Sequence, residues 1–213
     1  MKGMKGMKES LPVFAAFLAG LLFGAGGLVP SWLLAPWLPM ALLSVLVFLA
    51  GVGLGAGDDL PQLLHGFHLR MLLLPLCTVV GSLLFSAAGV WLFAGRGLTD
   101  CLAVGSGFGY YSLSSVLIAE MKSATLGADG AAELATVALV ANVAREMIAL
   151  LFLPLFARWG GRLAPISVAG INSMDVCLPM IVRCTGDRQV VPQALLHGVV
   201  LEVSVPVLIA AFC

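Results

Sequence analysis

Near the middle of this 213-residue chain stands the stretch LATVALVANVAREMIALLFLPLFA, residues 134–157. The stretch is apolar almost throughout and exceeds the roughly 20 residues that cross a bilayer as a helix. Arg145 and Glu146 stand at its centre. A charge at the bilayer centre costs about 2.5–3.5 kcal/mol, and intramembrane charges usually mark routes for ions or substrates. The stretch therefore predicts a membrane-spanning helix that serves transport.

The composition of the whole chain is that of a membrane protein. Residues are 61% hydrophobic and only 10% charged, whereas soluble domains have about 25% charged residues. We therefore predict an all-α integral membrane protein. The formal net charge of zero gives no electrostatic reason to expect nucleic-acid binding. The five cysteines lack CxxC spacing and are interpreted as packing residues. Without an HExxH, P-loop or Rossmann motif, we predict no metal, no cofactor and no enzymatic activity.

After a short basic N-terminus, residues 1–10, we expect about seven membrane-embedded segments. They are 11–29, 37–57, 71–94, 99–119, 134–157, 164–182 and 192–213. Glycines interrupt the segment 99–119, and Gly170 and Pro179 interrupt 164–182. Broken helices persist at membrane depth only where they are buried in protein or line a cavity. Paired interrupted segments also point to the binding site of a transporter, so we predict that these two are broken or re-entrant.

Positive charge outside the segments favours the re-entrant arrangement, with the N-terminus in the cytoplasm. Seven full spans would place Arg96, Arg158 and Arg162 outside, whereas two re-entrant segments place only Arg96 and Lys122 there. Re-entrant segments would also enter from opposite faces, so their tips could meet at the midplane.

The first group of candidate site residues is Asn142, Arg145 and Glu146, which share one helix face at positions i, i+3 and i+4. Arg145 and Glu146 point about 100° apart, so we expect each to have its main partner elsewhere. Arg145 would pair with Asp175 or with carbonyls of a broken segment, and Glu146 would meet a cation or a proton. The alternative is a buried ion pair that only locks two helices together.

The interrupted segments supply the second group. Near Asp175, Asn172 and Ser173, freed carbonyls and a carboxylate could coordinate a cation, and half-helix N-termini could hold an anion. Alternatively, Asp175 only caps a half-helix. In the last segment, Glu202 is a third membrane-level acid, and His197 is expected near the interface.

The fourth segment offers hydroxyl groups and glycines. They could replace water around an ammonium or a carboxylate, or serve helix packing alone. Its candidate residues are Ser106, Tyr110, Tyr111, Ser112 and Ser114.

Four stretches of this chain resemble the lysine exporter family LysO. They are GSGFGYYSLSS (105–115), NVAREMIALLFLP (142–154), INSMDVCLP (171–179) and HGVVLEVSVPVLIA (197–210). The resemblance implies that residues 11–213 form a transport domain of the bacterial inner membrane, and that the family's membrane acids correspond to Glu146 and Asp175. The family often has Trp at the position of Tyr110 and Gly at that of Ser115. Its long members carry an additional N-terminal unit of about three spans, which this chain lacks.

The residues and the resemblance together predict a secondary exporter of L-lysine and related basic amino acids, coupled to protons through buried acids. Export against a gradient needs such coupling. A separate small membrane protein or a second copy of the chain would supply the additional unit, or the chain would work without it. The alternatives are a Na⁺/H⁺ antiporter and a membrane subunit that transports only with a partner.

Overall fold

The computed structural model describes residues 68–91 and 95–213, with residues 15, 19, 20, 22–27, 30 and 52. The predictions for residues 1–10 and for the segments 11–29 and 37–57 therefore lie outside the described residues, except at the few single positions just given. Every regular element in the main described part is a helix. Among the described residues, three stretches are long and apolar enough to cross a membrane: Leu69–Trp91, Tyr111–Gly160 and Val190–Phe212. The predicted all-α membrane class is thereby confirmed.

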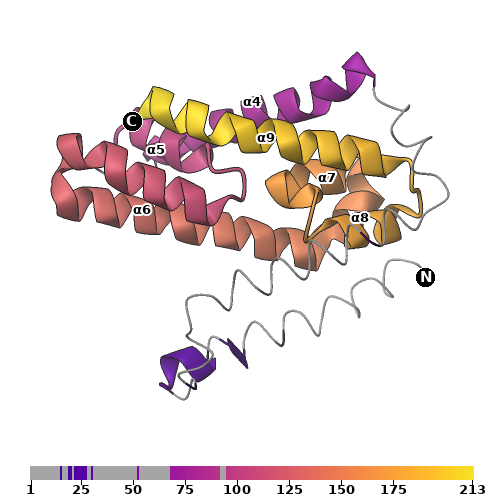
Figure 1. Ribbon diagram of the computed structural model, residues 1–213, viewed down its shortest axis with the longest axis horizontal. Coiled ribbons are helices and arrows are strands. Elements are labelled where there is room, and N and C mark those ends of the chain that lie inside the picture. Colours follow the sequence, from indigo (N-terminus) through magenta and orange to yellow (C-terminus); the bar gives the residue numbers. More distant parts are fainter. Residues whose placement is uncertain are drawn as a thin grey trace.

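The long helices account for the predicted segment 71–94 as far as Trp91, for 134–157, and for 192–213 as far as Phe212. The first combines η2 (Leu69–Leu72), α4 (Leu73–Ala87) and η3 (Ala88–Trp91); the others are α6 (Tyr111–Gly160) and α9 (Val190–Phe212). Gly127 interrupts α6 with φ 72° and ψ 170°, a conformation that suits glycine. It divides α6 into a first leg, 111–126, and a second leg, 128–160. Figure 1 shows that the first leg runs toward the end where the C-terminus lies and that the second leg runs back.

Both interrupted segments double back. The first hairpin consists of α5 (Leu98–Gly105), a non-helical tip at 106–110 and the first leg of α6. An ion pair of 2.7 Å between Lys122 Nζ and Asp100 Oδ1 joins its two arms at the base.

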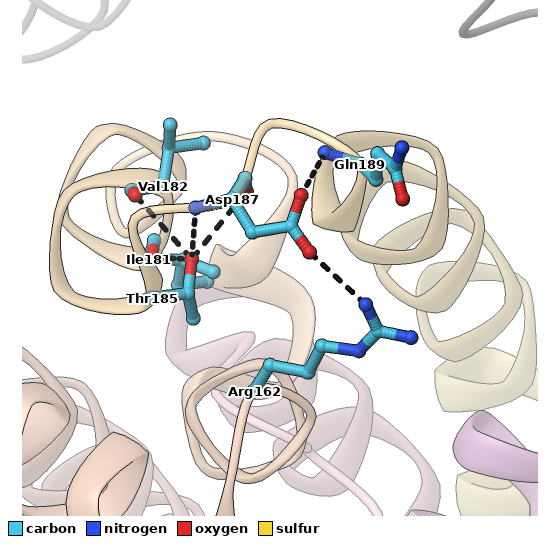
Figure 2. A network of polar contacts seen from close by, with 6 residues as sticks. All are labelled: Arg162, Ile181, Val182, Thr185, Asp187 and Gln189. Carbon is cyan, nitrogen blue, oxygen red and sulfur yellow. Dashed lines mark hydrogen bonds and ion pairs between the residues drawn. The ribbon is translucent and has the colours of Figure 1, made fainter.

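The second hairpin consists of α7 (Ala164–Ala169), η4 (Gly170–Ser173) and α8 (Leu178–Thr185). Its base is closed by a 3.1 Å ion pair between Arg162 Nη1 and Asp187 Oδ2 (Figure 2). The two hairpins enter from opposite ends of the molecule (Figure 1).

The tips of the two hairpins meet at a crossing. Ile171 N donates a hydrogen bond of 3.1 Å to the carbonyl oxygen of Phe108. Phe108 has a φ of 45° and Gly170 a φ of 64°. A Cβ atom at Gly170 would lie 2.2 Å from the Phe108 oxygen, so the close approach requires glycine. The sequence-based expectation that the tips meet agrees with this contact.

Two apolar clusters lie on either side of the crossing. One includes Phe108 and Leu201 and packs the first hairpin against the C-terminal half of α9. The other includes Ile166 and Ile181 and packs the second hairpin against the N-terminal half of α9. The second leg of α6 contributes to both clusters. Between its two apolar ends it presents its polar residues to the crossing.

Candidate functional site

Asn142, on the second leg of α6, holds the tip of the first hairpin. Its Oδ1 accepts a 2.7 Å hydrogen bond from Gly109 N. Its Nδ2 donates to Ala138 O at 2.8 Å and to Ser114 Oγ at 3.3 Å. The side chain is only 4% exposed, and its hydrogen-bonding groups are already engaged. We therefore assign Asn142 and Ser114 to supporting the crossing.

Arg145, one helical turn further on, holds the second hairpin. Its guanidinium donates to Val168 O at 3.2 Å, to Ser167 O at 3.1 Å and to Ser82 Oγ at 3.3 Å. The two carbonyls lie in the last turn of α7, where the helix supplies no donors and a cation is favoured. Of the two partners expected for Arg145, the structure has the backbone carbonyls.

Beside the crossing, Asp175 from the segment before α8 lies within electrostatic range of two other carboxylates, Glu146 from α6 and Glu202 from α9. The charges of Glu146 and Asp175 interact with each other and with the Tyr111 hydroxyl. Asp175 also senses Glu202. Each acid is half-buried, and within the described residues none forms an ion pair. We call Glu146, Asp175 and Glu202 the acid cluster.

Asp175 does not cap the half-helix that follows it. Its carboxylate accepts a hydrogen bond from the neighbouring Val176 N, which shapes the local turn. The helix α8 begins after Cys177, without a side-chain cap. The carboxylate remains partly exposed next to Glu146.

Asn172 offers an unused hydrogen-bond donor beside the acid cluster. The residue is 8% exposed, and its Nδ2 atom has no hydrogen-bond partner. The amide lies within reach of the Glu146 carboxylate for a weak hydrogen bond, but this contact falls outside good hydrogen-bond geometry. A buried donor without a partner costs about 1–3 kcal/mol. A ligand oxygen at this point would remove that cost.

The other predicted hydroxyl residues have mainly structural positions. Ser106 Oγ donates to Leu102 O at 2.7 Å at the end of α5. Tyr110 packs against the first apolar cluster, and Ser112 is exposed. Ser173 Oγ donates to Ala194 O at 3.0 Å and is fully buried. Of the fourth-segment candidates, only Tyr111 is brought to the acid cluster.

The side chain of His197, which was expected near the interface, is fully buried in the protein. Its Nδ1 lies 3.2 Å from Ser173 Oγ and its Nε2 lies 3.0 Å from Thr78 Oγ1. Thr78 Oγ1 in turn lies 2.7 Å from Ser167 Oγ. This polar chain links α9, η4, α4 and α7. Its signal in the sequence was the spacing to Leu201, four residues on, which puts His197 on the buried face of α9.

Sequence reasoning also missed the pair of Asp100 and Lys122 at the base of the first hairpin. Both side chains are less than a tenth exposed. They are 22 positions apart in the sequence, so only the turn at the tip brings them together.

Comparison with known proteins agrees with this architecture. Over 115 residues the chain is 37% identical to the lysine exporter LysO of Escherichia coli. The aligned region covers 54% of this chain and 35% of that protein. Over 120 residues it is 32% identical to a Haemophilus influenzae protein provisionally named a lysine exporter. This aligned region covers 56% of each of the two proteins. The chain thus matches only about a third to a half of the length of these relatives. No solved structure matches it.

The family match, in contrast, extends over almost the entire sequence. The model of the family described as lysine exporter LysO matches residues 14–213. That range includes both hairpins, the crossing and the acid cluster. This chain therefore belongs to the lysine exporter LysO family.

Proposed function

We propose that this chain is the transport domain of a secondary exporter of L-lysine and related basic amino acids. The observation that carries the proposal is the acid cluster at the crossing, whose three carboxylates come from separate segments and form no ion pair within the described part of the chain. In the described part of the chain, Arg145 at the crossing forms no ion pair with them, since its guanidinium donates to backbone carbonyls. A ligand that brings ammonium groups would supply the missing charge.

The roles of the residues follow from their surroundings. Glu146 and Asp175 would bind the ammonium groups of the substrate, and Glu202 would add to the negative field. The unpartnered amide of Asn172 would donate to the α-carboxylate, and the Tyr111 hydroxyl would lie beside it. Asn142 and Arg145 would hold the two hairpin tips that form the site.

Coupling to protons follows from charge balance. Ionised carboxylates that share a half-buried region repel one another, so the empty site favours proton uptake. A substrate ammonium and a proton therefore compete for the same carboxylates. Release of one without binding of the other would leave an uncompensated buried charge, which is costly. Such competition would couple export of the amino acid to inward movement of protons.

We place the protein in the inner membrane with its N-terminus in the cytoplasm, as the positive charges favour. Because the chain matches only part of its relatives' length, a small membrane partner or a second copy would complete the transporter where the chain alone does not suffice.

Flux of labelled L-lysine into liposomes, driven by an imposed pH gradient, tests the proposal. We expect gradient-dependent flux that Glu146→Gln and Asp175→Asn abolish. The matched control is Glu120→Gln, an acid exposed on the first leg of α6, which should leave the flux unchanged. Full, pH-independent export by both site variants would contradict the proposed coupling.

Two further arms separate the alternatives. If a sodium gradient drives proton movement and lysine does not, the protein is a Na⁺/H⁺ antiporter. If flux requires an added membrane partner, the chain is a subunit. The same variants then test the acid cluster in the complete complex.

A further inference from the structure

A partly open cavity lies away from the acid cluster. It has a volume of about 500 Å³ and lies between the end of α4, the helix α5 and the second leg of α6. This volume is within the range of about 300–1,000 Å³ that is usual for ligand pockets. From Val137, which lines it, the second leg continues for nine residues to Glu146, roughly 14 Å at 1.5 Å per residue. The cavity is therefore distinct from the crossing.

The wall of the cavity combines apolar surface with charges of both signs. Its apolar part includes Phe85, Val104, Leu134 and Val137, and its charged part is Arg96, Asp100 and Glu133. A basic amino acid has a carboxylate, two ammonium groups and a methylene chain between them. Arg96 Nη2 and Glu133 Oε2 form an ion pair of 2.8 Å with each other. A substrate that enters between them would offer its α-carboxylate to Arg96 and its α-ammonium to Glu133. Asp100 would then take the side-chain ammonium, and the apolar side chains would contact the methylenes.

Asp100 already holds an ammonium group. Lys122 Nζ lies 2.7 Å from Asp100 Oδ1, and the side chains are 6% and 9% exposed. Lys122 Nζ also approaches Thr99 Oγ1 at 3.4 Å. The chain thus presents a lysine side chain to a buried carboxylate of the cavity. The group that binds there is chemically the same as the end of a lysine substrate.

We propose that this cavity is a second binding site for basic amino acids, in which the substrate ammonium replaces Lys122 on Asp100. The inference rests on the proposed function, because it concerns the same substrate class. Lys122 lies at the base of the first hairpin, and a long lysine side chain can reach the membrane surface when displaced. With the N-terminus in the cytoplasm, this base faces outward, so the site would hold the substrate at the exit.

Equilibrium binding of labelled L-lysine to the purified full-length chain, with the stoichiometry measured, tests the proposal. We expect two molecules per wild-type chain. The change Lys122→Met removes the competing ammonium and should tighten the second site about tenfold, equivalent to about 1.4 kcal/mol. The double change Asp100→Asn/Lys122→Met removes both charges of the buried pair, and this variant should bind one molecule only. Norleucine, which lacks the side-chain ammonium, should not occupy the second site.

A matched control neutralises the pair at the other hairpin base, Arg162→Gln/Asp187→Asn, and should keep two sites. Thermal unfolding of each variant checks folding, and if Lys122→Met does not fold, the double variant decides by its stoichiometry. One molecule per wild-type chain, unchanged in the Asp100 double variant, would overturn the second site and leave the proposed function intact. No binding by any variant would overturn both.

Discussion

The two hairpins are fastened at opposite ends. The base of the first is an ion pair whose side chains are 6% and 9% exposed, whereas the pair at the base of the second is 65% and 28% exposed. At the tips, the second hairpin has the stronger attachment. The first tip is held by the neutral amide of Asn142, and the second by the guanidinium of Arg145. Charge that is shielded from water acts more strongly, so each hairpin has one strong and one weak attachment.

The weak base of the second hairpin is a solvated turn. Figure 2 shows Asp187 between Arg162 and the backbone N–H of Gln189, which donates to Asp187 Oδ1 at 2.8 Å. Thr185 Oγ1 donates to Ile181 O at 2.8 Å, and Gly186 ends α8 in the left-handed conformation. Apart from the pair of Arg162 and Asp187, these contacts are local in sequence. We infer that this base opens more readily than the base of the first hairpin.

Among these contacts, loss of the Arg145 contact at the second tip should lower the free energy of unfolding most. We expect Arg145→Met to lower the free energy of unfolding by about 4 kcal/mol, because hydrogen bonds to charged groups contribute about 1.5–3 kcal/mol each. Arg145→Lys keeps the charge but loses the planar fork, and its stability should be intermediate. Denaturant unfolding in detergent measures both. Wild-type stability of Arg145→Met would contradict the assignment of the second tip to this residue.

A larger side chain at the crossing should have the second largest effect on the free energy of unfolding. Gly170→Ala should lower the free energy of unfolding by about 3 kcal/mol, from positive-φ strain of about 1–3 kcal/mol and loss of the Phe108–Ile171 hydrogen bond. Gly161 is a matched control, since its φ is 74° and no atom lies within 4 Å of an added Cβ. Gly161→Ala should show the strain alone. Equal losses for the two variants in thermal unfolding would mean that the tips do not touch as described.

The neutral tip contact should be weaker than the charged one. Asn142→Leu leaves Gly109 N without its acceptor, and should lower the free energy of unfolding by about 2 kcal/mol, within the 1–3 kcal/mol of an unsatisfied buried group. Unfolding by denaturant, measured alongside Arg145→Met, gives the ranking of the two tips. A larger loss for Asn142→Leu would reverse the comparison.

The exposed base should matter least. Arg162→Gln should change the free energy of unfolding by less than about 1 kcal/mol, as is usual for exposed ion pairs. Added salt should remove what remains of the difference, because it screens exposed charges. Unfolding midpoints at low and high salt provide the measurement. A large, salt-independent loss would show that the second base is as tightly closed as the first.

Much of this architecture is visible in the sequence, because glycine, proline and hydrophobic periodicity are local signals. They predicted the two broken segments and the shared face of Asn142, Arg145 and Glu146. They could not predict that neighbouring positions on that face serve different hairpins. Lys122 and Asp100 were missed for the same reason, since their pairing depends on where the chain turns back.

The two apolar clusters have a consequence for how the protein loses its structure. Each cluster packs mainly around one hairpin, although Ile171 at the tip of the second hairpin joins the first cluster. Regions with separate apolar cores tend to open as separate cooperative units. Native-state hydrogen exchange should therefore divide α9 near His197 into two protected blocks, each exchanging together with its own hairpin.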